Sequence, residues 1–147
     1  MTPSPLATLP PPATAPARVP PIQTLALAEP LPGFPGHRHF VLVPAEPSGR
    51  LFWLQSVAEE GPRFLAVPAA SYFPDYTPAV PPAACADLGL EDVAAADVYC
   101  LVTVPEGDIA AATANLRAPV VVNPVTARAR QVVLADSRHP IRRPLRR

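Results

Sequence analysis

Lysine is missing from this 147-residue sequence, cysteine occurs only twice, and no long apolar run is present. Two cysteines cannot define a disulfide framework, and we expect Cys85 and Cys100 to be unreactive and to bind no metal. Cys100 lies within an apolar run and is predicted to be a small buried side chain. Because no stretch approaches the roughly 20 consecutive apolar residues that cross a bilayer, nothing indicates a membrane protein, and the expected compartment is the cytoplasm.

Signatures of catalysis are also lacking. Ser56 has no nucleophile-elbow context, and the sequence contains no glycine-rich phosphate loop. His37 and His39 alternate on one face of a predicted strand, but no third residue lies at a spacing typical of a metal site. We therefore expect no catalytic residue, no cofactor and no metal, and the sequence argues against an enzyme.

Charge is unevenly distributed, although the formal net charge is zero. From Ala110 onward there are eight arginines and one acid, Asp136, which gives this part +7; the remainder has four arginines and eleven acids, which gives −7. An arginine-rich end is compatible with nucleic-acid binding. No recognition helix or aromatic-interleaved basic motif accompanies it, so a small β-barrel nucleic-acid-binding domain that uses this end is kept as the alternative function.

The first 21 residues are set apart by their composition, because many of the 24 prolines gather there with alanine, threonine and leucine. Proline at this density favours extended, solvated chain over a packed core, so we expect a disordered leader at 1–21. It lacks the charged start and the unbroken apolar run of a signal peptide. Residues 22–145 then form one β domain, followed by a basic tail at 146–147.

Short β-forming runs separated by proline and glycine turns make up the rest of the sequence. The run at 98–104 is the densest in β-formers, so we expect a strand there that is buried on both faces at the centre of the sheet. A short helical turn is predicted at 83–88, a brief helix or irregular turn at 109–115, and irregular chain at 71–82. The predicted fold class is all-β, a small β-barrel-like domain of about seven short strands with minor helical turns, because closure disposes of exposed edges. The predicted strands are 22–28, 40–43, 50–56, 64–67, 98–104, 119–123 and 130–134.

Six unusual short strings follow one another along this domain. They are Pro32-Gly33-Phe34, Leu54-Gln55-Ser56, Phe73-Pro74-Asp75-Tyr76, Ala114-Asn115-Leu116-Arg117-Ala118-Pro119 with Asn123, Gln131-Val132-Val133-Leu134 and Pro144-Leu145. A string such as Leu-Gln-Ser occurs by chance in many proteins, but six in order at compatible spacings are specific. In this order and spacing the sequence resembles the flagellar assembly factor family FliW.

The resemblance implies a binding protein with a small β-barrel-like fold and no cofactor. FliW proteins bind the translational repressor CsrA, which relieves its block on flagellin messenger RNA, and they also bind flagellin itself. Free flagellin competes for FliW, so secretion of flagellin releases FliW to capture CsrA. We therefore expect two protein partners, CsrA and flagellin, no direct nucleic acid and no membrane, and a monomer when the protein is free.

Candidate binding residues fall into three groups. Phe73, Pro74 and Tyr76 either form an aromatic anchor for a partner or cover one end of the barrel. Asn115, next to Leu116, either clamps a turn through backbone hydrogen bonds or contacts a partner. Acidic residues fit a partner that carries arginine and lysine, and otherwise form an ordinary solvated face. The acidic set is Asp75, Asp87, Glu91, Asp92 and Asp97.

A further set of residues is expected to maintain the fold. Gln55 and Gln131 lie within predicted strands, where a buried amide pair between them would fix the strand register. The other members belong to the turns and strand ends of the strings described above. The complete set is Gly33, Phe34, Gln55, Pro119, Asn123 and Gln131.

Overall fold

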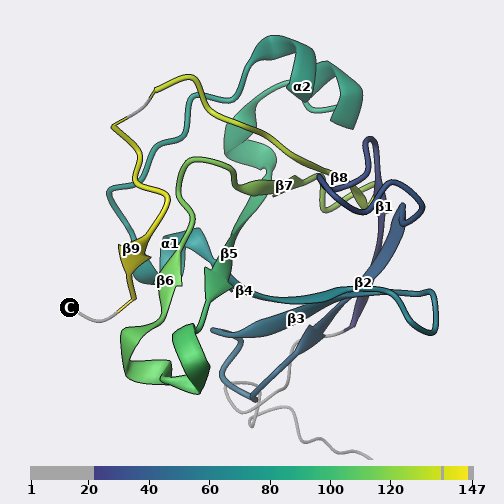
Figure 1. The fold of residues 1–147 in the computed structure, drawn as a ribbon. Coiled ribbons are helices and arrows are strands. Elements are labelled where there is room, and N and C mark those ends of the chain that lie inside the picture. The colour runs from purple at the N-terminus through teal and green to yellow at the C-terminus, as the bar shows by residue number, and fades with distance from the viewer. Residues whose placement is uncertain (1–21, 137, 146–147) are drawn as a thin grey trace, which may run out of the picture.

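The structure, a computed structural model that describes residues 22–136 and 138–145, is a β-barrel with short helices on its outside (Figure 1). The leader predicted at 1–21 and the basic tail predicted at 146–147 lie outside the described residues. The described strands are β1 (Gln23–Leu27), β2 (His39–Pro44), β3 (Phe52–Ser56), β4 (Arg63–Pro68), β5 (Asp97–Thr103), β6 (Thr113–Ala114), β7 (Val120–Val122), β8 (Arg128–Gln131) and β9 (Arg143–Pro144).

Seven of these strands close into a ring. Neighbours follow the order β4-β3-β2-β1-β8-β7-β5, and β5 pairs with β4 to complete the circle. Strands β1 and β8 run parallel over two residue pairs, whereas the other pairings of the ring are antiparallel. The two-residue strands β6 and β9 extend the sheet beyond β5. The predicted all-β, barrel-like domain of about seven strands is thus confirmed.

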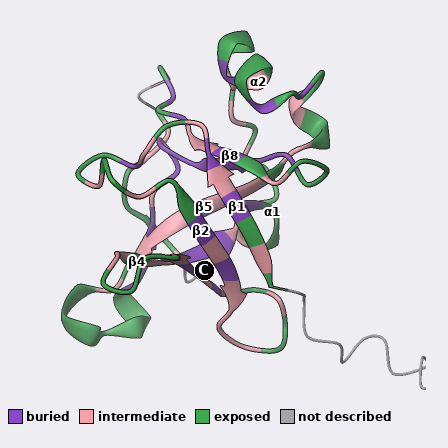
Figure 2. Cartoon of the chain, turned by 90° about the vertical axis from the view of Figure 1, so that its right-hand side faces the viewer, coloured by how far each residue is buried: buried purple, intermediate pink, exposed green. Residues whose placement is uncertain are grey.

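Side chains from alternate positions of the strands fill the barrel interior. Leu25 and Leu27 of β1 pack there with Phe40 and Leu42 of β2, and the alternation continues into β3. Phe40 is fully buried, and burial of a side chain of this kind contributes about 1.5–3 kcal/mol. Figure 2 shows buried segments alternating with more exposed ones along the barrel strands. Because successive side chains of a strand point to opposite faces, alternate residues join the core even where the sequence is continuously apolar.

Strand β5 is the junction of the sheet, because it pairs with β4 along one edge and with β7 and β6 along the other. Tyr99 and Leu101 pack with the barrel interior, while Cys100 belongs to a second cluster on the outside. The predicted central position is correct, but burial of the whole strand on both faces is wrong. Only Cys100 is buried, and the ends of the strand, Asp97 and Thr103, are exposed, because the outer cover reaches only its middle.

Two short helices lie outside the ring, α1 (Ala69–Tyr72) and α2 (Pro82–Leu88). Helix α2 has proline in its first turn and ends at Gly89, whose φ of 72° is the left-handed conformation that favours glycine. It confirms the helical turn predicted at 83–88. Helix α1 was not predicted, and it occupies the start of the chain expected to be irregular at 71–82.

The last third departs most from the predicted elements. Single 3-10 turns occur at η2 (Val93–Ala95), η3 (Pro105–Gly107) and η4 (Ile109–Ala111), and strand β6 follows within the predicted turn at 109–115. Strand β8 starts two residues before the predicted strand 130–134 and ends at Gln131. Beyond it, Val132 and Leu134 donate their backbone N–H groups to carbonyls of residues 119 and 117, at 2.9 and 2.8 Å, outside a continuous ladder. Strand β9 was not predicted either.

Candidate protein-interaction site

Residues Tyr72 to Tyr76, called here the aromatic segment, run from the end of α1 across the outside of the barrel. Phe73 is only 6% exposed and packs in the cluster that also contains Cys100. Pro74 and Asp75 are exposed, and the backbone N–H of Tyr76 donates to the carbonyl of Phe73 at 3.0 Å. The segment therefore anchors one aromatic ring in the core and presents a turn to solvent.

Tyr76 ties the aromatic segment to two later parts of the chain. Its hydroxyl donates to the backbone carbonyl of Leu116, and its ring meets the ring of His139 at 90° with the centroids 5.2 Å apart. Burial raises the pKa of Tyr76 above its ordinary value, and the nearby Cys100 adds to the rise. The phenol therefore stays protonated and keeps its role as a donor throughout the physiological pH range.

Asn115 holds the turn that precedes β7. Its Oδ1 accepts the backbone N–H groups of Arg117 at 2.9 Å and Ala118 at 3.1 Å, which is the turn clamp considered from the sequence. Leu116 is 2% exposed, so its side chain belongs to the core and only its backbone takes part in the surface contacts. Contact of either residue with a partner stays a prediction.

Strand β9 and the residues just before it lie along the aromatic segment (Figure 1). Pro140 accepts the backbone N–H of Leu116 at 2.9 Å, and the carbonyl of His139 accepts Nε of Arg117 at 2.9 Å. The guanidinium of Arg143 lies 5.2 Å from the centre of the Phe73 ring, a cation–π contact. These contacts bring residues far apart in the sequence to one surface.

Two grooves flank the aromatic segment and share Phe73, Pro74 and Tyr76 as a common wall. The basic groove, of about 270 Å³, is named for its two arginines and its histidine, although Asp75 also lines it. Its lining is Tyr72, Phe73, Pro74, Asp75, Tyr76, Thr77, Leu116, Arg138, His139, Pro140 and Arg143. The apolar groove, of about 320 Å³, is lined by Pro68, Ala69, Ala70, Phe73, Pro74, Tyr76, Pro78, Ala96, Asp97, Val98 and Tyr99.

The predicted acidic residues do not form one surface. Asp87 on α2 makes an ion pair with Arg130, which also lies 3.5 Å from Glu29. Asp92 accepts the backbone N–H of residue 94 at 3.0 Å and caps η2. Glu91 is exposed beside it. The charge of Asp87 is therefore already matched within the chain, and partner binding by the acidic set stays a prediction.

Asn123 is the buried polar residue that joins α2 to the β7–β8 turn. Its Nδ2 donates to the carbonyl of Leu88 at 2.7 Å, and its Oδ1 accepts the backbone N–H of Val125 at 2.9 Å. Asn123 is only 5% exposed, so these hydrogen bonds replace the ones that its amide makes with water in the unfolded chain. Pro119 is buried at the other end of β7. Asn123 is thus hydrogen-bonded within the chain and Pro119 is packed in the interior, and a structural role for both stays a prediction.

The predicted amide pair between Gln55 and Gln131 is wrong. Gln55 lies on β3 opposite Arg63 and Val41, whereas Gln131 lies on β8 opposite Val120, with two strands between them in the sheet. Both are half-buried, and Nε2 of Gln131 donates to the carbonyl of residue 118 at 3.1 Å. The error arises because two amides in separate strands reveal nothing about which strands are neighbours.

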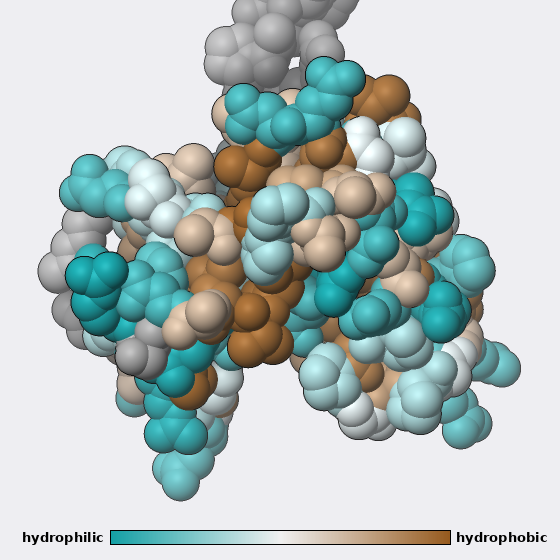
Figure 3. All heavy atoms as spheres, turned by 90° about the horizontal axis from the view of Figure 1, so that it is seen from above, coloured by the Kyte–Doolittle hydropathy of each residue, from teal (hydrophilic) through white to brown (hydrophobic). Residues whose placement is uncertain are grey.

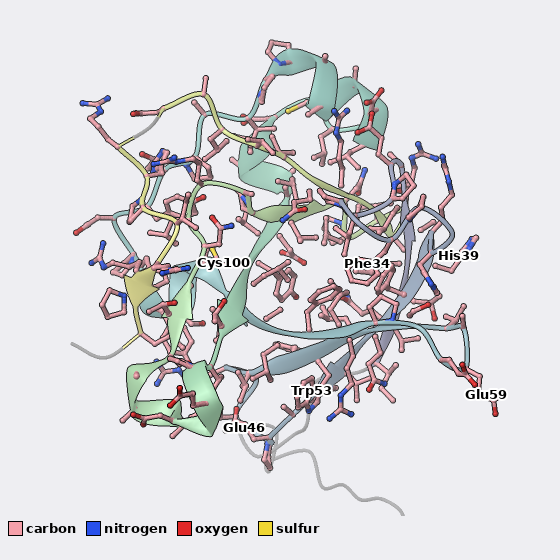
Figure 4. The ribbon with its side chains drawn as sticks, viewed as in Figure 1. Phe34, His39, Glu46, Trp53, Glu59 and Cys100 are labelled. Atoms are coloured by element: carbon pink, nitrogen blue, oxygen red, sulfur yellow. The ribbon has the colours of Figure 1, made fainter. Side chains whose placement is uncertain are left out.

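The Pro-Gly-Phe turn lies in the connection between β1 and β2, and the His-x-His pair ends at His39, the first residue of β2. Gly33 has a φ of 87°, and the ring of Phe34 packs edge-on against Phe64 with centroids 5.6 Å apart. His37 bonds Ser56 through Nδ1 and Oγ at 2.8 Å, while His39 is exposed on β2 (Figure 4). Within the described residues no group of three or more histidine, cysteine or acidic side chains is placed to hold a metal.

No helix in the described part of the chain is both long and apolar enough to cross a membrane. The surface seen from above the barrel mixes polar side chains with exposed apolar ones (Figure 3). Among the exposed apolar side chains, Val125 and Val133 are 90% and 69% accessible. Single exposed valines of this kind are ordinary on protein surfaces.

Arg143 and His139 were missed from the sequence as parts of the site. Arg143 had been counted only as a charge near the C-terminus, and its contact with Phe73 spans 70 positions of the chain. No local pattern reports a contact of that separation. To predict that the Phe-Pro-Asp-Tyr and Ala-Asn-Leu strings lie close together would have required knowledge of how β5 and β6 pair.

Comparison with known proteins gives a consistent result. The FliW protein family matches residues 13–145 of this chain. The flagellar assembly factor FliW of Symbiobacterium thermophilum is 41% identical over 115 residues, which cover 77% of this chain and 82% of that protein. That of Moorella thermoacetica is 33% identical over 125 residues, covering 85% and 79%.

The fold agrees with the same family. A crystal structure of the flagellar assembly factor FliW superposes with a TM-score of 0.74 and 26% sequence identity, covering 83% of this chain and 84% of that one. The family match over residues 13–145 includes the barrel and the chain that forms both grooves, and it agrees with the strings found in the sequence. This chain therefore belongs to the FliW family.

Proposed function

We propose that this protein is a cytoplasmic regulator of flagellar assembly that binds CsrA, relieves repression of flagellin synthesis, and binds flagellin in a partner switch. The observation that carries the proposal is the family match along residues 13–145, which includes every element of the barrel. The protein works by capturing partners and not by catalysis. Its expected free state is a monomer.

The surface around the aromatic segment supports capture of a protein. Exposed Pro74 and Asp75 lie between two grooves, and the rings beside them are held by contacts with Leu116 and Arg143. A rigid aromatic surface loses little conformational entropy on binding, which favours affinity. Binding hot spots are commonly built from such residues.

The arginines of the last third support the nucleic-acid alternative less well. Arg130 is paired with Asp87, Arg138 is paired with Asp136, and Arg143 lies over an aromatic ring. Phosphate binding requires cations that are free to replace the counterions of the nucleic acid. Arg130 and Arg138, whose charges are matched by carboxylates of this chain, are poorly suited to that role.

Calorimetric titration tests the proposal. The purified chain is titrated with CsrA and, separately, with flagellin from the same organism, and flagellin is then added to the CsrA complex. Binding to both, with displacement of CsrA by flagellin, is the expected result. Binding to flagellin alone removes the translational role, and binding to neither overturns the proposal.

An acidic residue offers a kinetic test of how CsrA is recognised. Glu91→Lys reverses an exposed charge without breaking an ion pair, whereas reversal at Asp87 would also disturb Arg130. We expect Glu91→Lys to slow CsrA association at low salt, because complementary charge acts mainly on the association rate. An unchanged association rate in stopped-flow measurements would remove Glu91 from the proposal. Glu59→Lys, in the β3–β4 loop, is the matched control (Figure 4).

A further inference from the structure

The apolar groove ends at an edge of β5 that β4 leaves unpaired. Strand β4 pairs with β5 as far as Pro68 opposite Tyr99, after which the chain turns into α1. On the other edge of β5 the pairing continues to Asp97 opposite Val122. The first two residues of β5 therefore have a strand on one side and the apolar groove on the other, which is a geometry suited to an extended segment of chain.

The walls of this groove are apolar, and its rim carries one charge. Val98 belongs to the partly buried side chains around the Phe73 cluster, and Ala69 and Pro78 also line the groove. None of the described residues that line the groove is positively charged. Asp97 is exposed, and no ion pair joins it to another described residue.

Asp97 supplies the charge at this groove. It is the acidic side chain among the described residues that line it. The basic groove lies on the far side of the aromatic segment, so its arginines do not line the wall that Asp97 occupies. A cation beside an aliphatic side chain complements this combination, whereas an anion there is repelled by Asp97.

We propose that the apolar groove docks an extended segment of a partner protein in which an aliphatic side chain stands next to an arginine or lysine. The aliphatic side chain occupies the space between Val98 and α1, and the cation pairs with Asp97. The inference rests on the proposed function in that a partner protein supplies the segment. It adds the chemistry of the segment and the wall that recognises it.

Peptide titrations followed by nuclear magnetic resonance test this site on the full chain. The probes are acetyl-Leu-Arg-Leu-amide, acetyl-Leu-Gln-Leu-amide and acetyl-Leu-Glu-Leu-amide. We expect all to shift resonances of Val98 and Ala70, with affinity falling from the arginine to the glutamate peptide by about two- to fivefold, as for an exposed ion pair. Equal affinities, or no shift at the groove, would overturn the proposal.

Substitutions assign the preference to one carboxylate. Asp97→Asn should abolish the advantage of the arginine peptide, and Asp97→Arg should transfer it to the glutamate peptide. Glu59→Gln makes the same change of charge as Asp97→Asn at a distant loop and should leave the preference intact (Figure 4). An equal loss in the Glu59→Gln variant would refute a local role of Asp97.

A steric variant tests the groove itself. Ala70 is exposed on α1 and lines the groove, so Ala70→Trp should fill it and weaken all three peptides while the spectrum keeps the dispersion of the folded protein. Undiminished binding in this variant would contradict the assigned position. Because no titration here contains CsrA or flagellin, the groove and the proposed function can each fail independently.

Discussion

The two halves of the barrel are built by different means. Strands β1 to β4 form a meander in which each strand pairs with the next in sequence, and their inward side chains make one apolar cluster. Strands β5 to β9 include a β7–β8 hairpin but also two longer-range pairings, β5 with β7 and β6 with β9, and this half depends on side-chain bonds from Asn115 and Asn123. Both grooves border the second half. The meander supplies most of the barrel-interior cluster, to which β7 and β8 add Val120, Val122 and Ala129, and the irregular half shapes the surface.

The largest effect is expected in the meander. Phe40 on β2 is fully buried, so Phe40→Ala removes a large side chain from the barrel interior and leaves a cavity. We expect the free energy of unfolding to fall by about 3–5 kcal/mol, measured by urea denaturation. A loss below about 1 kcal/mol would mean that the interior collapses around the gap, and the contrast between the halves would weaken.

In the second half of the barrel, the hydrogen bonds of the buried Asn123 side chain are expected to contribute to the free energy of unfolding. Asn123→Ala leaves the carbonyl of Leu88 and the N–H of Val125 without their partner, which should lower the free energy of unfolding by about 1–3 kcal/mol. Asn115→Ala is the matched control, because Asn115 is only half-buried and water can replace its bonds. An equal loss of stability in both variants would show that burial of the Asn123 amide does not determine the size of the effect.

A smaller effect is expected where the C-terminal strand meets the aromatic segment. Arg143→Met removes the guanidinium from above the Phe73 ring but keeps a long side chain, and should cost about 0.5–1 kcal/mol in thermal or urea unfolding. Arg142→Met makes the same change one residue earlier, at a side chain that does not line the basic groove. If both variants lose stability equally, overall charge and not the ring contact is responsible.

The smallest expected effect concerns an exposed ion pair. Hydrogen bonds from Arg138 lower the pKa of Asp136 to about 2. A lowered pKa in the folded state means that this contribution to stability is present above the ordinary carboxyl pKa of about 3.9 and is lost as pH falls toward 2. Arg138→Gln should raise the pKa of Asp136, measured by carboxyl carbon resonance. An unchanged titration would show that the side-chain pair is not formed in solution.

The same contrast explains what could be read from the sequence. The meander strands were predicted to within about two residues, because the runs of β-forming residues at 40–43 and 50–56 and the turn at Gly33 are local signals. Strands β6 and β9 are two residues long and exist only because β6 pairs with both β5 and β9. Pairings between such distant parts of the chain leave no signal in a short stretch of sequence.

The site was predictable only in part. The Phe-Pro-Asp-Tyr and Ala-Asn-Leu strings could be recognised because their composition is unusual, and the structure joins them through Tyr76 and Leu116. The role of Arg143, the pairing of Asp87 with Arg130 and the separation of Gln55 from Gln131 depend on tertiary geometry. For such residues, the sequence gives the chemistry of the side chain but not which residues become its neighbours in the fold.

The parallel pairing of β1 with β8 sets an order of events during synthesis. Ala26 must wait for its partner Arg128, roughly 100 residues later in the chain, before the ring can close. At a translation rate of about 5–20 residues per second, that delay is on the order of 5–20 seconds. The meander can form while the ribosome is still working, whereas the basic groove, which is lined by Arg138, His139, Pro140 and Arg143, is completed only when this last stretch has emerged. The basic groove is therefore among the last parts of the fold to form.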